Sequence, residues 1–515
     1  MCFLLLEGMV YYKETANKRR KQMRACGILL PIASLPGSYG IGSFSKEAYK
    51  FVDQLNIAGQ KYWQILPLGP TGYGDSPYQS FSTFAGNPNY IDLEDLIDRG
   101  WICKEECCAC EYGAGDRYID YEQVDVSHEM NLRKAFHASH IEEQEGFWQY
   151  CRSNEEWLED YALYMTLKKH FNGKSWCEWE LDIRLRHPEA MEQYRKQYQE
   201  ELLFYRFQQY MFHIQWNRLK NYANSKGIQI IGDLPIYVAF DSVDTWANPE
   251  LFQLNEVGMP VAVAGCPPDG FAPTGQLWGN PLYQWEYHKN TGYQWWISRI
   301  KHSSSLYDVI RIDHFRGFDE YYSIPFGNPT AEHGNWKPGP GYEIFQIMNQ
   351  KLGELHIIAE DLGYLTDSVR ELVRITGYPG MKVLEFAFDA YNPSEYLPYH
   401  YSKHCVVYTG THDNNTVKGW FLHMSHEDRR FLCEYIGVEM LEERDASMAL
   451  IRLALGSVAD LCMIPIQDYL NLGEEARMNE PSTVGNNWKW RLVEGEIKEE
   501  LLGKMNHMSR VYGRL

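Results

Sequence analysis

Three segments of the chain end in a carboxylate after a run of apolar or uncharged residues. Their acids are Asp313, Glu360 and Asp413, which lie about fifty residues apart. A buried strand that ends in an acid brings a charge to the edge of the core. Three such strand ends around one opening would place these carboxyl groups together. Retaining cleavage of a glycosidic bond needs a nucleophilic carboxylate and a separate carboxylic acid, so the pattern indicates this chemistry.

The neighbours of these acids predict different roles for them. Strand side chains alternate, so Arg311 and Asp313 point the same way, and we expect the guanidinium to lower the pKa of Asp313 and keep it ionised. The apolar neighbours of Glu360 and the charge of Asp313 should raise the pKa of Glu360, which suits an acid that later acts as a base. His412 and Asp413 are expected to hydrogen-bond to hydroxyls of the sugar being cleaved.

Each acid also has a structural interpretation, because an Asp or Glu at a strand end is commonly the N-cap of the next helix. Three such acids together, with Arg311 and two histidines beside them, favour catalysis. Cofactor motifs are incomplete: residues 173–175 lack the upstream glycine of a phosphate loop, and residues 40–45 lack the third glycine of a dinucleotide fingerprint. No metal-ligand set stands out, so we predict neither a cofactor nor a metal.

Composition narrows the class of partner. A formal charge of −20 argues against nucleic acid, whose phosphates are neutralised by Lys and Arg clusters. The 16 Trp and 37 Tyr of this chain offer flat apolar rings with a polar edge, which suit sugar faces. No stretch approaches the length of a membrane span. We therefore expect no membrane partner, and a monomer or weak homo-oligomer.

The 12 cysteines show no evident disulfide framework, which fits a reducing cytoplasm. A local cluster of four is open to two interpretations, a zinc site or a reduced surface segment. No His or second Cys pair follows at a usual spacing, which favours the surface segment. Its members are Cys103, Cys107, Cys108 and Cys110.

Eight short apolar segments read as strands, and most lack polar alternation, as strands of a parallel sheet covered on both faces do. Amphipathic stretches such as 45–58 and 365–376 lie between them as crossover helices. Strands interleaved with helices predict an α/β fold, a (β/α)8 TIM barrel. The predicted strands are 27–32, 62–68, 228–236, 309–315, 356–362, 381–386, 405–412 and 461–468.

The spacing of these strands predicts the domain organisation. We expect residues 1–22 to be an N-terminal extension and residues 23–515 to form a single catalytic barrel. Insertions are expected at about 69–227, as a mostly helical subdomain, and at about 240–305, as a lid-bearing segment. Only about 47 residues follow the last strand, too few for a C-terminal β-sandwich.

The three acid-ending stretches resemble motifs of the α-amylase clan, and nearly the whole chain, from Cys26 to Leu492, resembles 4-α-glucanotransferases, also called amylomaltases or disproportionating enzymes. The resemblance rests on long segments rather than on one acid. They are 27–32 with 34–37, 63–71, 74–79, 232–238, the segment up to Trp278, 475–479 and 487–488. Such enzymes are similar in lacking the β-sandwich of true α-amylases.

The resemblance implies a role for each candidate residue. Asp313 would be the nucleophile, Glu360 the acid/base and Asp413 the transition-state stabiliser. Arg311, His314 and His412 would line the donor subsite, and Tyr78 and Trp278 would contact glucose rings. Four further residues match positions near the bound chain: Ser76, Asp269, Gln276 and Asn487.

The implied reaction transfers a 1,4-α-glucan segment, with retention, to the 4-hydroxyl of another glucan or of glucose. Water competes for the covalent intermediate, so we expect the aromatic, Pro-rich lid segment to exclude it. Replacing Trp278 or Phe271 by Ala should then raise hydrolysis, and Gly270 puts the acceptor preference in doubt. An α-1,4-glucan hydrolase is the nearest alternative, and a catalytically silent glucan-binding barrel is the alternative from another class.

Overall fold

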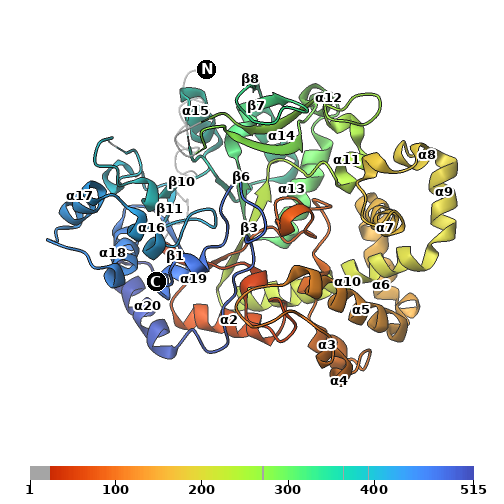
Figure 1. Cartoon of the computed structure of the whole chain (residues 1–515), viewed down its shortest axis with the longest axis horizontal. Coiled ribbons are helices and arrows are strands. Elements are labelled where there is room, and N and C mark those ends of the chain that lie inside the picture. The colour runs from red at the N-terminus through yellow and green to blue at the C-terminus, as the bar shows by residue number, and fades with distance from the viewer. Residues whose placement is uncertain (1–23, 269–271, 364, 393) are drawn as a thin grey trace, which may run out of the picture.

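The computed structural model describes residues 24–268, 272–363, 365–392 and 394–515. Eight parallel strands close into a barrel in which each strand pairs with the next strand of the barrel along the chain, and the last pairs with the first (Figure 1). This confirms the predicted (β/α)8 fold. The barrel strands are β1 Ala25–Leu29, β2 Tyr62–Gln64, β3 Gln229–Pro235, β6 Val309–Asp313, β9 Ile357–Ala359, β10 Gly380–Val383, β11 Cys405–Tyr408 and β12 Leu461–Pro465.

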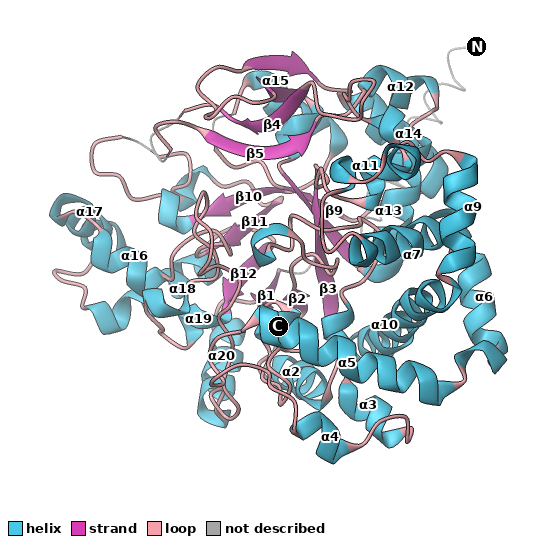
Figure 2. Cartoon of the chain, turned by 45° about the vertical axis from the view of Figure 1, so that its right-hand side comes forward, coloured by secondary structure: helices cyan, strands magenta, loops and turns pink. Residues whose placement is uncertain are grey.

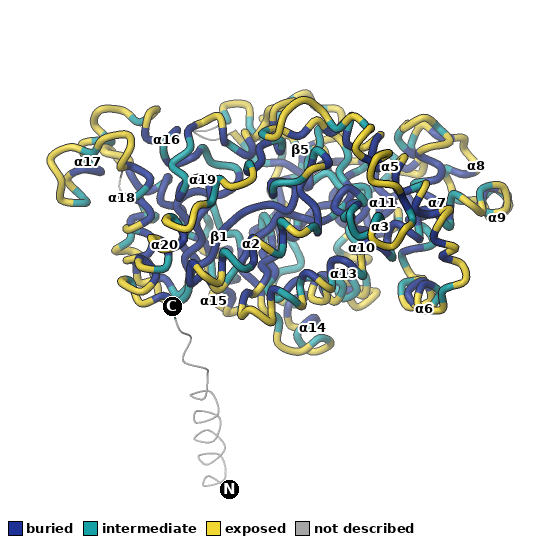
Figure 3. Tube along the Cα trace, turned by 90° about the horizontal axis from the view of Figure 1, so that it is seen from below, coloured by how far each residue is buried: buried dark blue, intermediate teal, exposed yellow. Residues whose placement is uncertain are grey.

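The barrel interior is filled by one face of these strands. Large apolar side chains from alternate positions pack together there, which is why the strands read as apolar runs. Residues on the opposite face pack against the surrounding helices and belong to the main core. Figure 3 shows the buried chain at the centre of the molecule and exposed segments on the outer helices and loops. The interior cluster consists of Leu29, Ile231, Ile358, Met381, Val383, Val406, Tyr408 and Met463.

Helices surround the barrel unevenly. One helix, α2, joins β1 to β2, whereas eight helices, α3 to α10, lie between β2 and β3 and form the large helical region on one side of Figure 1. Their bounds are α2 Lys46–Ile57, α3 Leu93–Asp98, α4 Lys104–Cys108, α5 Tyr121–Ser139, α6 Glu145–Ser153, α7 Glu155–His170, α8 Leu181–Arg184, α9 Pro188–Gln197 and α10 Gln199–Ser225.

The remaining helices follow the later strands. Those after β11 lie on the opposite side of the barrel from α5–α10 (Figure 1). They are α11 Val243–Ala247, α12 Trp285–Asn290, α13 Gln294–Leu306, α14 Tyr342–Leu352, α15 Asp367–Thr376, α16 Val417–His423, α17 His426–Ile436, α18 Glu443–Gly456, α19 Ile466–Tyr469 and α20 Glu499–Val511.

A second sheet of four antiparallel strands lies at one side of the barrel (Figure 2). Its order is β5 Gln276–Pro281, β4 Ala262–Cys266, β7 Glu320–Pro325 and β8 Asn335–Pro338. The segment predicted to bear a lid therefore contains β4 and β5, and the chain after β6 supplies β7 and β8 to the same sheet. The N-terminal extension and residues 269–271 lie outside the described residues.

Candidate active site

The parallel register of β6 and β9 brings the first two acids together. Ile312 lies beside Ala359, so Asp313 and Glu360 follow at the same level on neighbouring strands, which are about 4.8 Å apart in such sheets. The backbone N–H of His314, directly after Asp313, donates to Glu360 Oε2 at 2.7 Å. The two carboxyl groups thus share one edge of the barrel, as a double displacement requires.

Glu360 is held by its own loop and by β6. Its Oε1 accepts a hydrogen bond from Leu362 N at 2.9 Å. Burial raises the pKa of Glu360 to about 8, and the charge of Asp313 adds to the shift, whereas Arg311 and the two backbone donors oppose it. Near neutral pH the carboxyl is therefore largely protonated, which is the state that an acid catalyst needs.

Asp313 departs from the prediction made for it. Arg311 Nη2 donates to Asp313 Oδ1 at 3.0 Å, yet the pKa of Asp313 is raised to about 6, because burial outweighs the guanidinium. Arg311 is shared: its Nη1 donates to both carboxylate oxygens of the fully buried Asp233, each at 2.7 Å. The predicted direction of the shift was wrong, but Asp313 still ionises before Glu360.

Asp413 lies on the loop after β11 and is held from the loop that follows η10 (Glu474–Ala476). Asn479 Nδ2 donates to Asp413 Oδ1 at 2.6 Å, and Arg477 Nη2 donates to the Asp413 carbonyl oxygen at 3.1 Å. Its Oδ2 lies 3.4 Å from His412 Nε2. The backbone carbonyl and the side chain of Asp413 are therefore both held by residues about 65 positions further along the chain.

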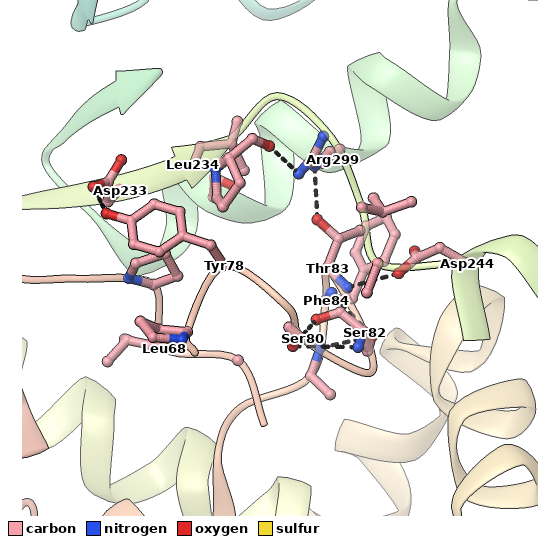
Figure 4. Close-up of a pocket in the computed structure, with 18 of the residues that line it drawn as sticks. Leu68, Tyr78, Ser80, Ser82, Thr83, Phe84, Asp233, Leu234, Asp244 and Arg299 are labelled. Atoms are coloured by element: carbon pink, nitrogen blue, oxygen red, sulfur yellow. Dashed lines mark hydrogen bonds between the residues drawn. The ribbon is translucent and has the colours of Figure 1, made fainter. Parts of the chain in front are cut away.

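Tyr78, on the chain after β2, contacts β3 and the loop after β11 at the barrel mouth. Its hydroxyl donates to Asp233 Oδ2 at 2.6 Å and lies 2.8 Å from His412 Nε2, which therefore donates to it. The Tyr78 and His412 rings stack, with centroids 5.3 Å apart. Figure 4 shows the Tyr78 hydroxyl pointing at Asp233. Behind Tyr78 lies a cavity of about 50 Å³, whose wall includes Thr83 and Arg299.

The second sheet brings Trp278 to the mouth. The Trp278 ring meets the His314 ring edge to face, with centroids 4.8 Å apart, and its Nε1 donates to Gln276 Oε1 at 3.1 Å. His314 has a left-handed backbone, with a φ of 55°, which is uncommon for a residue with a side chain. Burial, assisted by the charge of Arg316, lowers the pKa of His314 to about 3, so its ring is neutral.

The other predicted contacts differ in their surroundings. Ser76 lies beside Tyr78, whose backbone N–H donates to the Ser76 hydroxyl at 3.2 Å. The Asn487 side-chain amide is already hydrogen-bonded within its own loop. It donates to the Thr483 carbonyl oxygen at 2.9 Å and accepts from Glu480 N at 3.0 Å. Asp269 lies outside the described residues.

Sequence reasoning missed Asp233 and Asn479 as parts of the site. Asp233 follows two isoleucines and a glycine near the end of β3, the same pattern of an acid after apolar residues that singled out the other three acids. The same sequence pattern could therefore have identified Asp233 as a candidate site residue. Asn479 stands in an irregular loop, and nothing in its neighbours predicts that it reaches Asp413.

The cysteine cluster lies away from these residues. Cys107 is buried and donates to Asn131 Oδ1 at 3.3 Å, while Cys103 and Cys108 are exposed. Among the residues that the structure describes, no three or more His, Cys, Asp or Glu side chains form a group able to hold a metal ion. The described helices also include none that is long and apolar enough to cross a membrane.

The closed parallel barrel and the carboxyl groups at the ends of its strands define a class, the (β/α)8-barrel enzymes that act on carbohydrates. A family model described as 4-alpha-glucanotransferase matches residues 30–495. The chain therefore belongs to the 4-α-glucanotransferase family, amylomaltase-type glycosyltransferases that act on α-1,4-glucans. This confirms the family that the sequence motifs indicated.

Individual relatives agree with this family. The 4-alpha-glucanotransferase of Clostridium butyricum is 48% identical over 485 residues, covering 94% of this chain and 99% of the relative. That of Thermus thermophilus is 44% identical over 501 residues, with 96% and 99% covered. The structure of the amylomaltase from Streptococcus agalactiae in complex with acarbose matches with a TM-score of 0.92 at 41% identity, covering 95% of this chain and 99% of that one.

Proposed function

We propose that Asp313 and Glu360 carry out glucan transfer by a retaining double displacement. Asp313 attacks the anomeric carbon of the donor glucan while Glu360 gives its proton to the departing glycosidic oxygen. The glucosyl group is then an ester of Asp313. Glu360, now ionised, takes the proton from the 4-hydroxyl of an acceptor glucan or of glucose. That oxygen attacks the anomeric carbon and releases Asp313.

One observation carries this proposal: the β6–β9 register puts the two acids side by side, with the higher pKa on Glu360. Asp413 and His412 are proposed to bind hydroxyls of the sugar at the cleavage point, contacts that strengthen as positive charge develops on its ring. Arg311 and His314 are proposed to line the same subsite.

Further residues are proposed to bind the glucan chain. Tyr78 and Trp278 present rings at the barrel mouth, which suits the apolar faces of glucose units. The proposed polar contacts are Ser76, Asp269, Gln276 and Asn487. Within one catalytic barrel, the helices between β2 and β3 and the segment at about 240–305 are proposed to be insertions that wall this mouth.

Incubation with maltotriose tests the reaction. Transfer converts it into a ladder of longer and shorter oligosaccharides with a constant number of reducing ends, whereas hydrolysis makes the reducing ends increase. We expect the ladder. Asp313→Asn should lower kcat by about 10⁴-fold or more, because the nucleophile is lost. The exposed Asp182→Asn, which makes the same chemical change on helix α8, is the control. Turnover retained in Asp313→Asn would contradict the assignment.

The cysteines support a location as well. Several buried cysteines in the described part of the chain are free thiols, among them Cys151, Cys405 and Cys433. Cys26 and Cys462, which are paired in the register of β1 and β12, are free thiols as well. Free thiols at this number are typical of a reducing compartment, so we propose the cytoplasm. Thiol titration of the purified, unfolded protein checks that the cysteines are reduced.

A further inference from the structure

Glu385 is a buried acid at the barrel mouth that the reaction does not use. It lies in the short turn η8 (Leu384–Phe386) that follows β10. The register of β10 and β11 pairs Val383 with Tyr408, so Glu385 comes level with Gly410. Gly410 is the second residue of the loop after β11, which carries His412 and Asp413. The acid therefore lies beside the base of this loop.

The contact between Glu385 and Gly410 depends on the missing side chain of the glycine. A Cβ atom on Gly410 would lie 2.6 Å from Glu385 Oε1 and 3.1 Å from Glu385 Cδ. The neighbouring backbones are also joined, since Glu385 N donates to the Thr409 carbonyl oxygen at 3.2 Å. The Glu385 carboxyl group therefore occupies the space that a side chain at position 410 would need.

The groups that face Glu385 are already bound elsewhere. Asp468 accepts hydrogen bonds from the Thr409 hydroxyl at 2.6 Å and from Val417 N at 2.9 Å. Arg477 donates to the Asp413 carbonyl oxygen. Glu385 is 8% exposed, and its Oε1 has no hydrogen-bond partner among the described residues.

We propose that Glu385 is a positioning residue: its carboxyl group, packed against Gly410, holds the loop that carries Asp413. Burial first, and the charge of Asp468 second, raise the pKa of Glu385 well above its usual range, while Arg477 opposes them. A carboxylate at this position would compete with the Asp413 carbonyl for the Arg477 guanidinium. The neutral form of Glu385 leaves the Arg477 guanidinium hydrogen-bonded to the Asp413 carbonyl oxygen. This inference builds on the proposed role of Asp413.

Three variants test the proposal with maltotriose as donor. Glu385→Ala should lower kcat about tenfold with little change in KM, because Asp413 is displaced from its transition-state contact. Glu385→Gln, which is neutral and nearly the same shape, should restore most of the lost kcat. Gly410→Ala should also lower kcat, and less so when combined with Glu385→Ala, which removes the atoms that the new methyl group meets.

The charge state is tested by thermal unfolding from pH 5 to pH 8. A folded protein that keeps a proton on Glu385 becomes less stable as pH rises, because the unfolded chain releases that proton above about pH 4. Glu385→Gln removes this dependence, so its gain in Tm over the wild type should grow with pH, by about 1 °C or more per unit. The control Glu250→Gln, at an exposed position, should differ from the wild type in Tm by an amount that does not change with pH.

Three results would overturn the proposal: kcat of Glu385→Gln as low as that of Glu385→Ala, wild-type kcat in Glu385→Ala, or a Tm gain in Glu385→Gln that is constant with pH. Failure of the proposed function would look different. It would appear in the wild type as a missing ladder, or in Asp413→Asn as unchanged turnover, whatever the Tm data show.

Discussion

Asp313 and Glu360 differ by one methylene group, so their surroundings must give them different tasks. The Asp313 carboxyl group accepts a hydrogen bond from the charged guanidinium of Arg311. The hydrogen bonds that the Glu360 carboxyl group accepts come from backbone N–H groups. Burial raises both pKa values, but the pKa of Asp313 reaches about 6 and that of Glu360 about 8. In the proposed reaction, two acids in different environments would thereby supply the ionised nucleophile and the protonated acid in the same pH range.

These shifts predict a bell-shaped pH profile of kcat/KM for maltotriose. Activity should fall below about pH 6, where Asp313 gains a proton, and above about pH 8, where Glu360 loses one. The two limits belong to the pair as a whole. With an α-maltotriosyl fluoride donor, the leaving fluoride needs no proton, so the alkaline limit of the first step should weaken. An alkaline limit unchanged with the fluoride would contradict Glu360 as the acid.

The hydrogen bond from Asn479 to Asp413 should matter for the transition state. Asn479→Ala leaves Asp413 Oδ1 without its donor, and we expect kcat to fall about 10- to 100-fold, as loss of a ~1.5–3 kcal/mol bond to a charged group predicts. Steady-state kinetics with maltotriose measure it. Asn392→Ala, which removes an exposed amide that also binds an aspartate, is the control. An equal loss of kcat in Asn479→Ala and Asn392→Ala would contradict a role of the Asn479–Asp413 hydrogen bond in the transition state.

At the scale of elements, strand register decides which side chains meet. The eight barrel strands were predicted from apolar runs, but most were drawn too long toward the mouth: residues 62–68 were predicted where β2 is Tyr62–Gln64, and 405–412 where β11 is Cys405–Tyr408. Apolar character continues past the last ladder hydrogen bond because the loops at the mouth are also buried. Hydrophobicity reports burial and does not report pairing.

The antiparallel sheet was not predicted, for a different reason. Its strands are short and contain Gly and Pro, as in β5 (Gln276–Pro281), and β4 pairs with β7 across about sixty residues of sequence. No local pattern specifies such a pairing. The three candidate acids could be predicted because each lies at or shortly after the carboxyl end of a barrel strand. Asn479 and the Glu385–Gly410 contact depend instead on loops from distant parts of the chain.

The antiparallel sheet makes the predicted effect of Trp278 testable. Alternation along β5 leaves Leu277 exposed and turns Trp278 toward His314. Trp278→Ala should raise the ratio of hydrolysis to transfer about 2- to 10-fold, the effect of losing a ~0.5–1.5 kcal/mol aromatic contact that keeps water from the intermediate. Reducing ends and oligosaccharide products, counted together, give the ratio. Leu277→Ala should leave it unchanged, and an equal ratio in both variants would refute the role of Trp278.

Across the whole molecule, the two ends of the barrel do different work. The carboxyl ends of the strands carry the acids, whereas a buried arginine lies at the amino ends of β1 and β12. Arg514 is fully buried and donates to the carbonyl oxygens of Ala25, at the start of β1, and of Leu455, at the end of α18. Further bonds of its guanidinium reach Ala454, Ser457 and Asp460. It joins the first barrel strand to the chain that leads into the last.

This separation of ends predicts a variant that loses stability without losing chemistry. Arg514→Ala leaves several buried carbonyl groups without donors, and we expect the free energy of unfolding to fall by about 2–5 kcal/mol. The proposed catalytic acids lie at the opposite end of the strands, so kcat per folded molecule at 25 °C should stay unchanged. Chemical denaturation and maltotriose kinetics on the same sample measure both quantities. Arg510→Ala, an exposed change in the last turn of α20, should alter neither. A fall in kcat for Arg514→Ala would mean that losing the Arg514 hydrogen bonds displaces the acids at the other end of the strands. The two ends of the barrel would then not be independent.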